Sequence, residues 1–261
     1  MNNKKYLIIL LSLVIAFVFI SSQKISENKK DNSGKLYPRN VIDFSQNMLV
    51  YIKSELPYKS YIDTLENIDL NKLYLELNNH EKKLAFWLNT YNSLVQIRLI
   101  ENPSLFEDKT AFFKNNDIII GNEKLSLDDI ENGILRCKKN VSNQNFTEKF
   151  KLNSIENRIH FTLNCGATSC PAIAYYKPNL IEKQLENATK FYVENNCEYN
   201  SDKNEIIISE LFSWFKEDFN GEVGIINFLK KYNLIPKEEV KYVKIIYKEY
   251  DWGLKPGNFK E

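Results

Sequence analysis

The sequence predicts an α+β fold, in which one mostly helical domain carries a small mixed or antiparallel sheet. Apolar residues recur at helical spacing in several long segments, whereas a few short segments alternate or are rich in β-branched residues. The 261 residues are 43% hydrophobic and 13% aromatic, which is enough apolar surface for a core. Only 8 glycines and 7 prolines are present, which argues against collagen-like, propeller or linker-rich architectures.

The charge of the chain excludes one large class of partners. Lys and Arg number 35 against 34 Asp and Glu, a formal net charge of +1. Sequence-independent binding of nucleic acid requires a strongly basic surface, because the protein must neutralise phosphates. We therefore expect no nucleic-acid partner, and no motif indicates a cofactor.

The first 22 residues differ in kind from the rest and predict export from the cytoplasm. Lys4 and Lys5 precede an apolar run over residues 6–20, and two serines follow it, as in a secretory signal. Because no small-x-small cleavage site is present, residues 1–22 are interpreted as either a cleaved signal peptide or an uncleaved signal anchor, a transmembrane helix. Residues 23–40 are polar and are interpreted as a flexible tether. The folded domain, residues 41–261, is then extracytoplasmic: secreted, periplasmic or membrane-anchored.

Helices are expected along most of this domain. The clearest spans residues 81–101, where apolar residues recur every three or four positions and Asn102-Pro103 ends the pattern. Residues 42–66 predict helices that are broken near Pro57. Residues 126–129 (SLDD) resemble a capping box that opens another helix. Further helices are expected over residues 178–195, 209–219 and 222–232.

The expected strands are short. Residues 117–120 and 124–127 predict a hairpin around Gly121-Asn122. Residues 158–163 (RIHFTL) alternate polar and apolar side chains, which predicts a half-buried strand. The remaining strands are expected over residues 205–208 and 242–247.

The densest candidate site is the segment RIHFTLNCGATSCP at residues 158–171. It places His160, one of only two histidines, shortly before Cys165 and Cys170. Pro171 is favoured at the start of a helix, so Cys170 is expected at a helix cap, where the dipole and free amides lower the pKa of a thiol. With His160 as the base, this arrangement is typical of a Cys/His nucleophile, for which Cys165 is the second candidate.

The same cysteines also fit a structural role. In an oxidising compartment Cys137, Cys165, Cys170 and Cys197 could form two disulfides, and a bond between Cys165 and Cys170 would close a short loop. No metal site is predicted, because the spacing His-x4-Cys-x4-Cys lacks the CxxC pattern of structural zinc sites. The second histidine, His80, lies beside charged residues at the start of a predicted helix and is expected to be exposed or to cap it.

Three amide side chains lie inside the clearest helix. Asn89, Asn92 and Gln96 occupy a helix that is otherwise dense in aromatic and apolar residues. Asparagine is a mediocre helix former, and buried amides need hydrogen-bond partners. They predict either a clamp on a neighbouring loop or the wall of a site, in which Asn89 or Asn92 orients His160 or a substrate carbonyl.

Four segments of the chain form a recognisable set of motifs. They are KLAFWLNTYNSL at residues 83–94, SLDDIENGILR at 126–136, RIHFTLNCGATSCP at 158–171 and YDW at 250–252. Together they resemble the family of domain of unknown function 547 (DUF547), found in bacterial envelope proteins and in plant proteins. Two positions depart from the family pattern. Asn132 stands where the family often has histidine, which argues against a catalytic role there, and residues 253–255 (GLK) replace a more usual SLN.

The resemblance does not assign a biochemical activity, and two functions remain open. By analogy, the His/Cys arrangement is similar to that of papain- or transglutaminase-like thiol hydrolases, which implies a fold of that kind and a hydrolase or acyl transferase acting on peptide or amide bonds. Cys170, or Cys165, would then be the nucleophile and His160 the base. The residues expected to orient, bind or support the site are Asn89, Asn92, Glu131, Arg136, Asn164 and Trp87. The alternative is a non-catalytic envelope scaffold or binding domain with structural or disulfide-bonded cysteines; the substrate or envelope partner is unknown.

Overall fold

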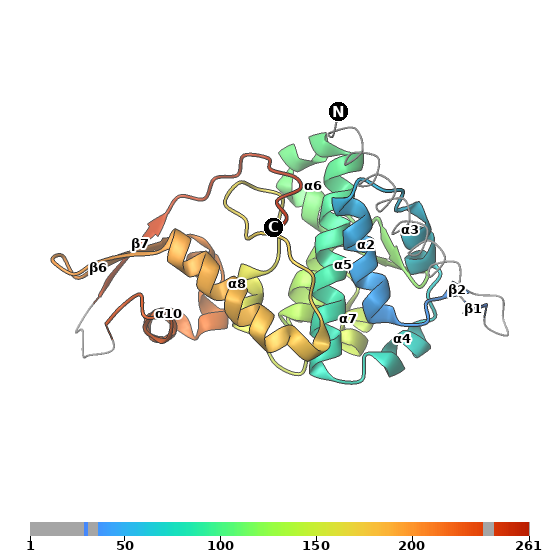
Figure 1. The fold of residues 1–261 in the computed structure, drawn as a ribbon, viewed down its shortest axis with the longest axis horizontal. Coiled ribbons are helices and arrows are strands. Elements are labelled where there is room, and N and C mark those ends of the chain that lie inside the picture. Colours follow the sequence, from blue (N-terminus) through green and yellow to red (C-terminus); the bar gives the residue numbers. More distant parts are fainter. Residues whose placement is uncertain (1–28, 31–35, 237–242, 261) are drawn as a thin grey trace, which may run out of the picture.

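The molecule is built around one long buried helix. The computed structural model describes residues 29–30, 36–236 and 243–260. Figure 1 shows α5 (His80–Glu101) in the middle, with α2 and α3 on one side and α8, α10, β6 and β7 on the other. The class is α+β, as the sequence predicts.

The first half of the domain is helical with one small hairpin. Helices α2 and α5 pack against each other along their lengths. The helices are α2 (Val41–Lys53), α3 (Lys59–Glu66), α4 (Leu70–Glu76), α5 (His80–Glu101), α6 (Lys109–Lys114) and α7 (Gln144–Phe150), with the 3-10 helix η1 (Pro103–Glu107) and the π-helix η2 (Asp129–Leu135) between them. The predicted helices over 42–66, with their break near Pro57, and over 81–101 are confirmed.

The second half alternates short helices with strands. Its elements are η3 (Asn157–Phe161), η4 (Pro178–Leu180), α8 (Ile181–Asn196), β5 (Glu198–Asn200), β6 (Glu205–Ser209), α9 (Leu211–Trp214), η5 (Lys216–Phe219), α10 (Gly221–Lys231) and β7 (Lys244–Lys248). The helix predicted over residues 209–219 is thus two short helices that Phe215 separates. The helices predicted over 178–195 and 222–232 are confirmed.

The described strands form small separate sheets. In the hairpin of β3 (Ile118–Ile120) and β4 (Glu123–Leu125), Gly121 and Asn122 have φ of 59° and 67°, the left-handed pair that a tight hairpin turn needs. The mixed sheet has the order β5-β6-β7, with β5 antiparallel and β7 parallel to β6. Two short strands, β1 (Lys29–Lys30) and β2 (Leu36–Tyr37), pair within the segment expected to be a tether.

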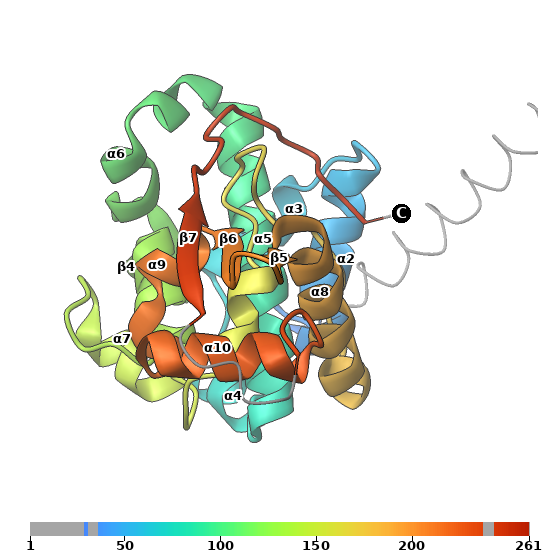
Figure 2. The ribbon, with the colours of Figure 1, turned by 90° about the vertical axis from the view of Figure 1, so that its left-hand side faces the viewer.

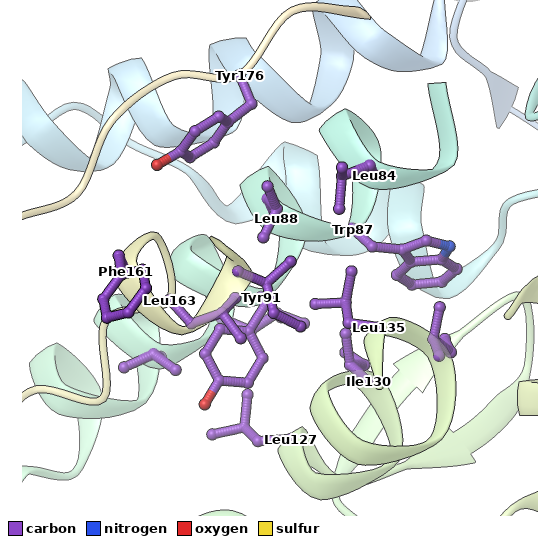
Figure 3. Close-up of a cluster of buried hydrophobic side chains, with 14 of the residues drawn as sticks. Leu84, Trp87, Leu88, Tyr91, Leu127, Ile130, Leu135, Phe161, Leu163 and Tyr176 are labelled. Carbon is purple, nitrogen blue, oxygen red and sulfur yellow. The ribbon is translucent and has the colours of Figure 1, made fainter. Parts of the chain in front are cut away.

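Helix α5 is buried on all sides, which explains its composition. The expected apolar stripe from Leu84 to Leu99 lies in the core, and so do the amides on its other face. Figure 3 shows side chains of α5, among them Leu88 and Tyr91, beside side chains of the 127–135 region and of residues 161–163. Because other segments surround the helix, its apolar side chains pack in the core and its amide side chains can bind neighbouring loops.

Two predictions about the candidate segment are wrong. Residues 158–163 do not form a strand: residues 157–161 form the 3-10 helix η3, in which Ile159, His160 and Phe161 are all buried. The alternation of polar and apolar residues predicts a strand with one exposed face. In the structure His160 is buried like its apolar neighbours, so no exposed face exists. Nor does Pro171 open a helix, since residues 171–177 form no helix and the next one begins at Pro178. Cys170 therefore has no helix dipole beside it.

The predicted export segment, residues 1–22, lies outside the described residues. Within the described part of the chain, no helix combines the length and apolar character required to cross a membrane.

Candidate functional site

A cavity of about 320 Å³ opens where the four sequence motifs meet. The motif residues that line it are Tyr91 from α5; Asp128, Glu131, Asn132 and Arg136 around η2; His160, Leu163, Cys165 and Pro171 from the central segment; and Tyr250 and Trp252 near the C-terminus. Segments up to about 160 positions apart in the sequence thus converge on one hollow. Lys109, Phe113, Trp214 and Phe215 complete much of the remaining wall.

His160 is buried at this cavity, and its imidazole is neutral at pH 7. Its Nε2 lies 3.0 Å from Oδ2 of Asp218, and its ring stacks on Phe215 with the centroids 3.9 Å apart. Burial lowers the pKa of His160 to about 4, and the positive charges of Arg136 and Lys138 act in the same direction. If Nε2 donates its proton to Asp218, Nδ1 is left as the proton acceptor, and this atom is buried without a hydrogen-bond partner.

Asp218, on η5, organises the charges behind His160. Its carboxylate pairs with Arg136 Nε at 2.5 Å and with Lys138 Nζ at 3.0 Å. Burial alone would raise the pKa of Asp218, but hydrogen bonds from His160, Arg136 and Lys138 outweigh burial and hold this pKa well below its ordinary value. Asp218 is not among the residues predicted from the sequence. The only available indication was an acidic residue in the aromatic-rich segment WFKEDF at residues 214–219.

The expected supporting residues Glu131 and Arg136 both lie at the cavity on η2. The amide of Arg136 donates to the carbonyl of Glu131 at 2.9 Å, the five-residue spacing of a π-helical turn. Arg136 also stacks 4.5 Å above the ring of Phe215 and donates to Asn132. Glu131 accepts a 2.6 Å hydrogen bond from the Tyr91 hydroxyl, and burial raises the pKa of this carboxyl.

The Ser126–Asp129 capping box that opens η2 is confirmed. The Ser126 amide donates to Asp129 Oδ2 at 2.8 Å, and the Asp129 amide donates to Ser126 Oγ at 3.0 Å.

Cys165 and Cys170 are joined by a disulfide, whereas Cys137 and Cys197 are free. The expectation of two disulfides is therefore correct for one pair only. Cys165 lines the cavity, while Cys170 is only 6% exposed and does not. Of the two nucleophile candidates, it is thus the second one, Cys165, that shares the cavity with His160.

The C-terminal segment holds the disulfide loop in place. The amides of Thr168 and Ser169 donate to the carbonyls of Gly253 and Asp251, at 2.7 and 3.2 Å. Figures 1 and 2 show this last segment running beside the loop that precedes α8. The hydroxyl of Tyr250 lies 3.2 Å from each sulfur of the disulfide.

The amides of α5 clamp loops. Asn89 binds both backbone groups of Tyr176, and Asn92 accepts from the amide of Asn164 at 2.8 Å while donating to the carbonyl of Thr162 at 3.0 Å. Gln96 donates to the Asn164 side chain at 3.2 Å. This confirms the clamp interpretation of these residues, and the partner that orients His160 is Asp218.

The two other expected residues support the site from a distance. Asn164 donates to the carbonyl of Pro171 at 2.7 Å and accepts from the amide of Gly166 at 3.0 Å, so it shapes the disulfide loop. Trp87 is fully buried in the core against Phe146 and Phe150 and does not line the cavity.

Metal ligation finds no support in the described residues, which contain no group of three or more His, Cys, Asp or Glu side chains placed to hold an ion.

Comparison with known proteins finds one matching family. Residues 75–193 match the family described as protein of unknown function, DUF547. No curated protein and no solved structure matches the chain. The matched region contains Tyr91, Glu131, Arg136, His160 and Cys165, whereas Asp218 and Tyr250 lie beyond it. The match over residues 75–193 supports the resemblance to the DUF547 family that the sequence motifs indicate.

Proposed function

We propose that the cavity is the active site of a thiol hydrolase or acyl transferase acting on peptide or amide bonds, with Cys165 as the nucleophile and His160 as the base. One observation carries this proposal: Cys165 and the neutral His160 line the same cavity, and the Asp218 carboxylate lies directly behind His160. A thiol, an imidazole and a carboxylate that orients the imidazole are the groups that Cys-dependent acyl transfer uses. The analogy with papain- and transglutaminase-like enzymes rests on these groups.

The proposed reaction requires the reduced protein. Nδ1 of His160 takes the proton of the Cys165 thiol, and the sulfur attacks the substrate carbonyl carbon. When the tetrahedral intermediate collapses, the C–N bond breaks, the amine leaves with the proton from His160, and the acyl group remains on sulfur as a thioester. Water or an acceptor amine then releases it. The Tyr250 hydroxyl, 3.2 Å from Cys165 Sγ, is available to donate to the developing oxyanion.

The location that suits this protein is outside the cytoplasm. The apolar run at residues 6–20 supports export, and a Cys165–Cys170 disulfide is a bond that persists in oxidising compartments. The substrate or partner would then be a component of the cell envelope or its surroundings.

The second candidate function is a non-catalytic binding domain, and the disulfide favours it. With Cys165 and Cys170 bonded, neither sulfur is a thiolate. The aromatic walls at Trp214, Phe215 and Trp252 would still suit an apolar ligand.

An acylation experiment separates the two functions. In the Cys170→Ser variant Cys165 cannot form the disulfide, so the variant is treated with p-nitrophenyl acetate and the acetylated residue is located by peptide mass spectrometry. The enzyme proposal predicts acetylation of Cys165, slowed about 100-fold by adding His160→Gln and unchanged by adding the control His80→Gln. If Cys165 is acetylated no faster than Cys137 and Cys197, the binding-domain function is the better account.

A further inference from the structure

We infer that the Cys165–Cys170 disulfide is the reactive group of a thiol–disulfide exchange site, at which a small-molecule thiol in the cavity attacks Cys165 and Cys170 leaves as a thiolate. Acyl transfer requires a free Cys165, whereas this exchange uses the disulfide itself. The inference therefore goes beyond the proposed function and does not depend on it.

Access decides which sulfur is attacked. Cys165 lines the cavity of about 320 Å³, so a small thiol that enters meets this sulfur. Cys170 is 6% exposed and lines a separate cavity, to which neither His160 nor Cys165 contributes. Exchange depends on which sulfur a thiolate can approach, and a thiol in the His160 cavity meets Cys165 and not Cys170.

Hydrogen-bond donors decide which sulfur leaves. The amides of Cys165 and Ala167 point at Cys170 Sγ from 3.0 and 3.3 Å, and these two amides favour Cys170 as the leaving sulfur. The Tyr250 hydroxyl lies 3.2 Å from both sulfurs and can add a hydrogen bond to the thiolate that leaves. The loop can turn both amides toward one sulfur because Gly166 adopts φ of +90°, which other residues rarely adopt. A leaving thiolate is stabilised by such donors, and a stabilised leaving group departs faster.

The exchange balances with a thiol as the reductant. The thiolate forms an S–S bond to Cys165 while the Cys165–Cys170 bond breaks, and the electron pair of that bond stays on Cys170. A second thiol then attacks the mixed disulfide, which releases an external disulfide and leaves Cys165 as a thiol. Two external thiols are oxidised and one protein disulfide is reduced; in reverse, the dithiol protein reduces an external disulfide.

Trapping the mixed disulfide tests the direction of attack. The oxidised wild-type protein is treated with 2-mercaptoethanol without denaturant, quenched with acid and mapped by mass spectrometry. The expected product carries mercaptoethanol on Cys165 and a free thiol on Cys170. An adduct mainly on Cys170 would overturn the assigned direction. A disulfide that is reduced only in urea would overturn the exchange site and leave a structural bond.

Tyr250→Phe tests the leaving-group stabilisation in a protein that keeps the aromatic ring. Loss of one hydrogen bond to the departing thiolate should slow formation of the mixed disulfide about tenfold. The matched control is Tyr232→Phe, which removes a hydroxyl that binds Glu186 and lines neither the cavity nor the disulfide loop. Equal rates for Tyr250→Phe and wild type would contradict stabilisation of the leaving thiolate by the Tyr250 hydroxyl. Acylation of Cys165 in Cys170→Ser is measured separately, so failure of either proposal leaves the other standing.

Discussion

Nε2 of His160 lies 3.0 Å from Oδ2 of Asp218, although 58 positions separate the two residues in the sequence. Arg136 and Lys138 bind the same carboxylate from the end of η2. This one buried acid therefore joins the central motif, the η2 motif and η5 behind the cavity.

Replacing Asp218 with Asn should destabilise the fold strongly. The partly buried Arg136 and the neutral His160 would lose their shared, fully buried acceptor, and breaking such a pair costs about 3 kcal/mol. Urea unfolding measures the loss. The matched control is Asp63→Asn, which removes an exposed i,i+4 pair with Lys59 and should cost less than about 1 kcal/mol. Similar losses in both variants would mean that the buried cluster contributes no special stability.

Stability should depend on the protonation of His160. Because its pKa in the fold, about 4, is below the ordinary 6.5, the unfolded chain binds a proton first as the pH falls. The stability that the fold gains from keeping His160 neutral is fully present above about pH 6.5. The free energy of unfolding then falls by at most about 3 kcal/mol between pH 6.5 and pH 4. Asp218, with its lowered pKa, acts in the same direction but only below the ordinary carboxyl range.

Two histidine variants isolate this effect. The free energy of unfolding is measured from pH 7 to pH 4 in His160→Gln and in the control His80→Gln, each beside wild type. Glu131 has a raised pKa and acts with the opposite sign in the same range, so the difference between proteins is the quantity to compare. We expect the free energy of unfolding to depend much less on pH in His160→Gln than in His80→Gln. A dependence that is equal in the two variants would refute the assignment.

Removing the disulfide should cost less than removing the buried acid. The bond closes a short loop of five sequence positions, for which the chain-entropy model gives about 2 kcal/mol. The double variant Cys165→Ser/Cys170→Ser is therefore expected to unfold at lower urea concentration by that amount. Cys137→Ser, at a free cysteine, should change the free energy of unfolding by less than about 1 kcal/mol. No loss in the double variant would show that the bond does not stabilise this fold.

The clamp on the central segment can be tested at Asn92. Asn92→Ala leaves the amide of Asn164 and the carbonyl of Thr162 buried without their partner, which should cost about 2–3 kcal/mol. Asn195→Ala removes only an exposed bond within α8 and should have little effect. Thermal or urea unfolding of both variants provides the comparison, and equal stability would argue against the clamp.

The sequence predicts most of the helices because their patterns are local. The stripe along α5, the break near Pro57 and the Gly121-Asn122 turn each depend on residues close together in the chain. The predicted strand over residues 158–163 is wrong because its pattern does not reveal tertiary burial. His160 is polar, but Asp218 and Phe215 give it a buried place that only the folded chain provides.

The site is predictable in its composition but not in its geometry. The motifs contain Cys165, His160, Glu131 and Arg136, and all four line the cavity. The sequence favours Cys170 as the nucleophile because Pro171 is expected to start a helix beside it. No helix starts at Pro171. Asp218 could not be predicted from a sequence motif, because it lies 58 positions from His160 and no local pattern connects the two residues.

The central claim is that Cys165 and His160 act together in one cavity, and alkylation of the Cys170→Ser variant tests it most directly. The free cysteines Cys137 and Cys197 serve as internal references, since burial raises the pKa of both thiols, that of Cys197 to about 12. Iodoacetamide labelling at pH 7, followed by peptide mass spectrometry, should modify Cys165 first, and adding His160→Gln should slow only that reaction. Labelling of Cys165 that is no faster than that of the two references, or that ignores the His160 substitution, would contradict the claim.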